Sequence, residues 1–277
     1  MRDKKDTERA AGHIVRFRHN LYPLLYDRTM NCLPYRFIES VMLRLCNNDD
    51  ITALTTLEGL FGYVGRRMVR DRFSAHFEGK VELVQNCASK QIMDSFEPRF
   101  CASIKIYILS GNMLPPLSVA TIKNLQQYAR TTTLMVQARD LPEELLSVLT
   151  DIRVTEIALM SEPDNSIRYL AQTLIQKGQL RCAGVHDKFM EDRNVELFFP
   201  TLFQPQFRTL IFAQCDERII ELVRSFLEGN KKEIVGKCVG FQEPNEWTFE
   251  DFSAAFEGFN LEEGNSKNKE CRVFIRL

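Results

Sequence analysis

The feature that most constrains this chain is a short apolar pattern that recurs after residue 80. Each occurrence has two apolar side chains separated by one residue, and consecutive occurrences lie about 23 to 30 residues apart: Ile104/Ile106, Leu134/Val136, Ile157/Leu159, Leu180/Cys182, Leu210/Phe212 and Val239/Phe241. Such alternation is typical of a strand with one buried face. The spacing leaves room for one helix between strands, which favours parallel strands joined by crossovers.

The segments between these strands carry helix start and stop signals. Three predicted helices begin near Asp140, Ser166 and Asp216. The first resembles a capping box, with Glu143 as its partner. The other two have apolar stripes at helical spacing and end near Gly178 and Gly229. We therefore predict an α/β fold with an irregular β/α repeat over residues 80–277.

The clearest single repeat is residues 207–215, where Phe207, Leu210, Phe212 and Cys215 match the leucine-rich-repeat template position for position. The other units keep the strand core but lose the last position of the template. The repeat is therefore predicted to be leucine-rich-like, with mostly parallel strands, rather than a regular leucine-rich repeat.

Composition narrows the function classes. The 277 residues are 44% apolar, and their net charge of −1 gives the chain as a whole no electrostatic reason to bind nucleic acid or a membrane surface. No apolar run approaches the roughly 18 residues that span a bilayer. Residues 1–29 form a polar, basic-leaning extension without the apolar core of a signal peptide. We expect reduced cysteines and a cytoplasmic or nuclear location.

Motifs for catalysis, cofactors and metals are missing. Residues 229–237 (GNKKEIVGK) have the wrong glycine spacing for a phosphate-binding loop, and no CxxC or HxxxH exists. We expect no catalytic residue, no metal and no cofactor. The alternatives are a Cys–His nucleophile from Cys182 and His186 or from Cys215 and His76, and phosphate contact by Arg66, Arg67, Arg70 and Arg72, a cluster that is more ordinary as a solvated helix end.

A different pattern precedes the repeat, in a predicted helical module at residues 30–75. It opens with Leu33-Pro34 and carries two apolar helical stripes separated by a polar break at residues 47–50. We interpret it as a helical hairpin whose second stripe is Ile51, Leu54, Leu57 and Phe61, with Gly59, Gly62 and Gly65 allowing a neighbour to approach closely. So small a module needs either the rest of the chain or another protein to cover its stripes.

This module resembles an F-box. The positions that carry the resemblance are Leu33-Pro34, Phe37, Val41-Met42, Leu45, Asp50-Ile51, Leu54, Leu57, Phe61 and Val64. It departs from the family by one extra loop residue, by Phe61 in place of tryptophan and by Leu60 in place of a basic residue. The rest of the chain is similar to nematode-expanded F-box proteins with an F-box-associated or leucine-rich-like C-terminal half, in the fragments LPYRFIESVMLRL, LEGLFGYVGRRM and FRTLIFAQCDERIIELVRSF.

The resemblance implies a non-catalytic substrate-recognition adaptor of a cullin-based (SCF-type) ubiquitin ligase. The module would bind a Skp-type linker protein, which connects it to the cullin ligase core, while the β/α domain would hold a protein target. The expected linker-binding residues are Leu33, Pro34, Phe37, Val41, Leu45, Ile51 and Leu54.

Target contact is expected on strand side chains that point away from the helices. These are the residues between or after the apolar pairs: Lys105, Tyr107, Met135, Gln137, Met160, Arg181 and Ile211. Their mixture of Met, Tyr and Arg suits a protein interface. It suits an ordinary solvated face equally well.

The alternative function needs no ubiquitin ligase. Repeat architectures must cover their terminal apolar faces, and the helical module could be such an end cap. The chain would then be a protein-binding scaffold.

Overall fold

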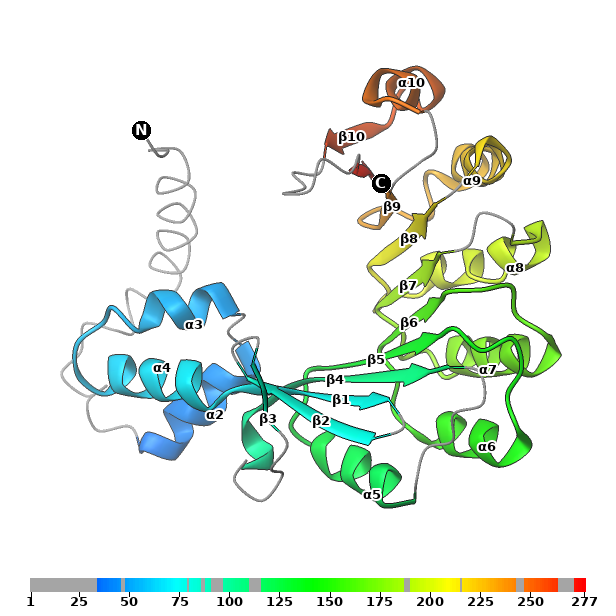
Figure 1. Ribbon diagram of the computed structural model, residues 1–277. Coiled ribbons are helices and arrows are strands. Elements are labelled where there is room, and N and C mark those ends of the chain that lie inside the picture. Colours follow the sequence, from blue (N-terminus) through cyan, green and yellow to red (C-terminus); the bar gives the residue numbers. More distant parts are fainter. Residues whose placement is uncertain are drawn as a thin grey trace.

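The computed structural model describes residues 34–45, 48–78, 80–85, 88–90, 97–109, 116–186, 190–214, 216–242, 247–263 and 272–277. The strands in these ranges form one 11-stranded sheet with the order β10-β11-β9-β8-β7-β6-β5-β4-β1-β2-β3 (Figure 1).

Seven neighbouring strands of this sheet run parallel: β1 (Phe73–Glu78), β4 (Cys101–Ile108), β5 (Thr131–Val136), β6 (Glu156–Leu159), β7 (Cys182–Val185), β8 (Thr209–Ala213) and β9 (Cys238–Gln242). From β4 to β9 each strand lies beside the next one along the chain. Antiparallel strands extend both edges: β2 (Lys80–Gln85), β3 (Ala88–Lys90), β10 (Asn260–Glu263) and β11 (Arg272–Arg276). The predicted α/β fold with mostly parallel strands is confirmed.

The helices between the parallel strands lie along one face of the sheet (Figure 1). They are α5 (Pro116–Leu125), α6 (Glu143–Asp151), α7 (Asn165–Gln176), α8 (Asp192–Glu196) and α9 (Glu217–Asn230). This part of the chain also contains two short 3-10 turns, η3 (Pro98–Phe100) and η4 (Phe199–Phe203), and the helix α10 (Phe249–Ala255). A sequential strand order with crossovers on one side leaves the opposite face of the sheet uncovered by these helices.

Burial alternates along the strands because one face packs on these helices. In β5, Thr132, Leu134 and Val136 are buried, while the residues between them are half-buried. The buried side chains of successive strands stand side by side, since Leu134 pairs in register with Ile157 of β6. The hydrophobic core therefore lies between the sheet and α5–α9.

Two of the predicted helices follow their sequence signals closely. The apolar stripe of α7 (Ile167, Leu170, Ala171, Leu174, Ile175) is buried, and Gly178 follows its end with φ 61°. The side chain of Asp164, not Ser166, caps this helix by accepting from the backbone N–H groups of Ser166 and Ile167. The Asp216 side chain caps α9 as predicted, by accepting from the Ile219 N–H.

Two local predictions were wrong. The strand signal Leu180/Cys182 is displaced, because the buried residues of β7 are Ala183, Gly184 and Val185, whose small side chains give little apolar signal. The expected capping box at Asp140 does not form. Instead α6 begins after Pro142, which makes no side-chain cap.

The amino-terminal module contains three described helices rather than a hairpin: α2 (Tyr35–Leu45), α3 (Asn48–Leu54) and α4 (Gly59–Asp71). The expected second helix ends at Leu54, and Gly59, with φ 70°, starts a new one. A Cβ at Gly65 would lie only 3.1 Å from the backbone carbon of Leu54 and 3.2 Å from the backbone nitrogen of Thr55. The predicted close approach at a glycine is therefore confirmed.

The boundary between the two parts also differs from the prediction. Strand β1 begins at Phe73, directly after α4, within the range assigned to the module, and the parallel array therefore starts earlier than residue 80. The polar segment after Phe241 contains α10, where Thr248 and Asp251 form a capping box, and the strand β10. The predicted extension at residues 1–29 lies outside the described residues.

Gly62 offers a test of the helix packing. A Cβ at this position would clash with the Leu57 carbonyl oxygen, whereas a Cβ at Gly229 in α9 would meet nothing within 4 Å. We expect Gly62→Ala to lower the free energy of unfolding by at least about 2 kcal/mol. Gly229→Ala should leave it unchanged or raise it by up to about 1 kcal/mol. Urea denaturation measures both, and equal effects would contradict the packing of α4 described above.

Candidate functional site

The predicted linker-binding residues divide between the outside and the inside of the module. Phe37 and Val41, one turn apart on α2, are 54% and 36% exposed, and Pro34 is also exposed. Ile51 is 1% exposed and therefore packs inside the module, and Leu54 is half-buried against the core. Leu33 and the Leu45 side chain lie outside what the structure describes.

The inner side of α2 is held by a buried carboxylate. The Glu39 side chain is 4% exposed, and it accepts hydrogen bonds from Arg99 Nη1 at 2.8 Å and from the Tyr35 hydroxyl at 3.0 Å. Arg67 of α4 lies 3.9 Å away and donates to the Tyr35 hydroxyl at 2.9 Å. The Phe100 ring lies 5.3 Å from the Arg67 guanidinium and 5.0 Å from that of Arg99. We call Tyr35, Glu39, Arg67 and Arg99 the Glu39 network.

The pKa shifts in and beside this network keep Arg67 and Asp71 charged and Tyr35 neutral. The hydrogen bond to Tyr35 raises the pKa of Arg67 above its ordinary value. Desolvation by burial raises the pKa of Tyr35, which keeps its hydroxyl protonated as a donor to Glu39. The hydrogen bond from Arg70 lowers the pKa of Asp71, a residue that also accepts from Arg67 at 3.2 Å.

Four of the seven predicted target-binding residues lie on one face of the sheet, namely Lys105, Tyr107, Met135 and Ile211. Tyr107 and Met135 are register partners, and their row continues through Ala158 and Gly184 to Ile211. Lys105 lies in the neighbouring row. Gln137 and Met160 follow the carboxyl ends of β5 and β6. Tyr107, Met135 and Ile211 therefore form the central apolar row of the open face, with small residues between them.

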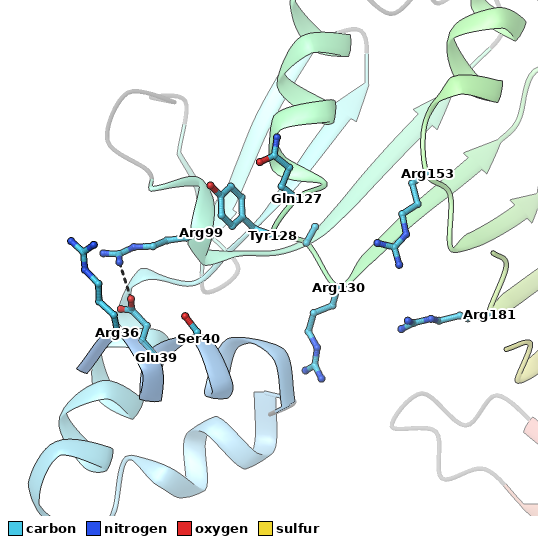
Figure 2. A pocket seen from close by; sticks show the side chains of 10 residues that line it. Arg36, Glu39, Ser40, Arg99, Gln127, Tyr128, Arg130, Arg153 and Arg181 are labelled. Atoms are coloured by element: carbon cyan, nitrogen blue, oxygen red, sulfur yellow. Dashed lines mark hydrogen bonds and ion pairs between the residues drawn. The ribbon is translucent and has the colours of Figure 1, made fainter. Parts of the chain in front are cut away.

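Arg181 lies elsewhere, at the amino ends of the parallel strands, where it lines a cleft of about 620 Å³ beside α2 (Figure 2). The other lining residues are Arg36, Glu39, Ser40, Arg99, Gln127, Tyr128, Ala129, Arg130 and Arg153. We call this the arginine cleft. Figure 2 shows Arg130, Arg153 and Arg181 extending into the same space from three successive strand starts.

Sequence reasoning missed the arginine cleft. An arginine precedes each of β5, β6 and β7, at Arg130, Arg153 and Arg181. This recurrence was readable beside the strand pattern. The contribution of Arg36 was not, because it depends on where α2 packs.

The predicted alternatives for phosphate contact and thiol chemistry meet different surroundings. Arg67 belongs to the Glu39 network, Arg66 donates to the Thr55 carbonyl at 2.9 Å, and Arg70 pairs with Asp71 at 2.7 Å. Cys182 begins β7 and His186 follows its end, and the His186 ring lies against Gly184. Cys215 lies outside the described residues.

The described thiols at positions 101, 182 and 238 are free. Burial raises the pKa of both Cys101 and Cys182 to about 12. Such thiols stay protonated at neutral pH and are weak nucleophiles. Across the described ranges, no three His, Cys, Asp or Glu side chains gather as metal ligands, and no helix has the length and apolarity to cross a membrane.

Comparison of this chain with protein-family models, with curated protein sequences and with solved structures finds no match.

The Glu39 network makes a prediction about stability. Glu39→Gln keeps the shape of the side chain but removes the charge that compensates Arg99 and Arg67. We expect the free energy of unfolding to fall by about 2 kcal/mol. Glu262→Gln is the control, because Glu262 pairs with Arg276 on the surface and such pairs contribute at most about 1 kcal/mol. Equal losses in chemical denaturation would show that Glu39 is not an anchor.

The thiols make a second prediction. At pH 8 a thiol with a pKa of about 12 is ionised to roughly one part in ten thousand, so native Cys101 and Cys182 should resist iodoacetamide. The same residues should react readily in urea. Mass spectrometry of tryptic peptides measures both rates. Fast alkylation of native Cys182 would show a reactive thiol.

Proposed function

We propose that the protein is a non-catalytic substrate-recognition adaptor of a cullin-based ubiquitin ligase. The helical module binds a Skp-type linker protein through α2, and the open face of the sheet holds a protein target. The resemblance of the module to an F-box suggests the class of partner, and the two faces of α2 support the proposal.

One observation carries this proposal. Ile38 and Met42 of α2 are buried in the core, whereas Phe37 and Val41, each one residue earlier, point outward. An aromatic and an aliphatic side chain on consecutive turns of one helix form a small apolar surface. Burial of such side chains contributes about 1.5 to 3 kcal/mol each, so a partner that covers both would gain binding free energy from this surface.

The sheet supplies a second surface that is separate from the first. Tyr107, Met135 and Ile211 lie in one row on the face opposite α5–α9, and each is half-buried. Between Met135 and Ile211 the row consists of Ala158 and Gly184, and the His186 ring lies over Gly184. A target segment could place apolar side chains against Tyr107, Met135 and Ile211.

Function would then follow from proximity alone. A protein that binds a ligase core on one surface and a target on another raises the effective concentration of target lysines near the ubiquitin carrier. This chain would need no reactive group for that role.

A second candidate function is favoured by the buried half of the module. Ile38, Met42, Ile51, Val64 and Met68 belong to the same continuous core as the sheet. A module joined to the core in this way also suits an end cap, and the protein would then be a binding scaffold outside any ligase.

Substitutions on the two exposed turns separate these candidates. We expect Phe37→Asp and Val41→Asp to abolish co-purification with a recombinant Skp-type linker. Phe37→Ala should weaken binding about tenfold or more, because it removes one buried side chain from the interface. The melting temperature should change little, since both side chains are exposed.

Tyr169→Asp is the matched control. Tyr169 is 57% exposed on α7, far from the module in sequence, and its substitution should leave linker binding intact. Failure of the wild-type protein to bind any Skp-type linker, with the fold intact, would favour the scaffold and contradict the adaptor.

A further inference from the structure

We propose that the arginine cleft binds a small molecule that carries two or more linked phosphate groups. The cleft lies between α2 and the segments that lead into β4, β5, β6 and β7. This site is independent of the proposed adaptor function, because it uses neither Phe37 and Val41 nor the apolar row of the sheet.

Charge is the first argument. Five arginines line the cleft, and Glu39 is the single acid among its lining residues. The Glu39 carboxylate is already neutralised by Arg99, which also donates to Glu97 at 2.6 Å. Among the described residues that line the cleft, Glu39 is thus the one acid set against five arginines. The cleft is therefore strongly positive, although the net charge of the chain is −1.

The second argument is that several of these arginine side chains have no partner among the described residues. Within the part of the chain that the structure describes, Arg36, Arg153 and Arg181 make no side-chain hydrogen bond or ion pair. Each presents a planar fork of N–H donors that matches the oxygens of a phosphate group. Three such forks beside one cavity could receive an anion without first breaking an ion pair to any other residue that the structure describes.

The spacing of the arginines indicates how many phosphate groups the ligand carries. Arg130, Arg153 and Arg181 precede adjacent strands, and neighbouring strands lie about 4.8 Å apart, so the three starts span about 10 Å. A single phosphate group is too small to reach all three. A chain of two or three linked phosphates reaches across them, and the cleft volume of about 620 Å³ is that of a small-molecule site.

An aromatic side chain at the rim of the cleft indicates which group could be attached to the phosphates. Tyr128 lines the cleft and is 46% exposed, so its ring is available to stack on a flat group. A nucleoside triphosphate would use this ring, whereas inorganic tripolyphosphate would not. Both share the chemistry proposed here, and their relative affinities distinguish the sources.

Isothermal titration calorimetry of the full chain tests this site. The probes are tripolyphosphate, ATP, inorganic phosphate and citrate, at matched ionic strength. We expect saturable binding of tripolyphosphate that is at least tenfold tighter than that of phosphate or citrate. Binding should weaken as salt is raised. Tighter binding of ATP that is lost in Tyr128→Ala would identify a nucleotide as the source.

The variant Arg153→Gln/Arg181→Gln should lose at least about thirtyfold in affinity for tripolyphosphate, because each guanidinium provides charge-assisted hydrogen bonds. Arg139→Gln/Arg193→Gln is the control with the same change in charge, at exposed arginines outside the cleft. It should bind like the wild type. Circular dichroism checks that both variants fold, and the linker co-purification assay should be unaffected by either.

Three results would overturn the proposal. The first is equal binding of citrate and tripolyphosphate, which would indicate a general attraction of anions. The second is an equal loss of affinity in the two double variants. The third is tighter binding of a single-stranded oligonucleotide or a phosphorylated peptide than of either small phosphate probe, which would assign the arginines to a macromolecule.

Discussion

The buried carboxylate of Glu39 is the interaction on which the position of the helical module depends. A carboxylate removed from water must be compensated by nearby charge and hydrogen bonds. Arg99 provides that charge from the segment that leads into β4, and Tyr35 provides a hydrogen bond from within α2. A shift of α2 away from Arg99 would separate this carboxylate from the charge that compensates it. The same placement turns Phe37 outward and brings Arg36 to the arginine cleft.

The parallel arrangement of β4 to β9 has two further consequences. All the crossover helices lie on one face, so the apolar row through Tyr107, Met135 and Ile211 stays open on the other (Figure 1). Because these strands are parallel, their amino ends also lie side by side along one end of the sheet. Residues that precede successive strands therefore gather there, and three of them are arginines (Figure 2). One topology thus underlies both the proposed target surface and the arginine cleft.

Sequence patterns predicted the elements whose information is local. Helices α7 and α9 carry their own caps and apolar stripes, and most strands carry alternating side chains. Strand β7 was placed too early because Ala183 and Gly184 are weakly apolar, while Leu180 just before it is strongly so. The break after α3 depends on the positive φ of Gly59, which no apolar periodicity records.

The sites were less predictable than the elements because they depend on tertiary packing. Phe37 and Ile38 are adjacent apolar residues, and only the contact of α2 with the core decides which of them is exposed. Likewise, Arg36 and Arg181 are far apart in the chain, and only the packing of α2 beside the strand starts brings them to one cleft.

The central claim is that α2 packs one side on its own core and leaves the other for a second polypeptide. Hydrogen–deuterium exchange of the peptide Tyr35–Leu45, with and without a Skp-type linker, tests this most directly. The account predicts slow exchange in the free protein and further protection when the linker is added, with no change in α7. Exchange in α2 that is unaltered by saturating linker would contradict it.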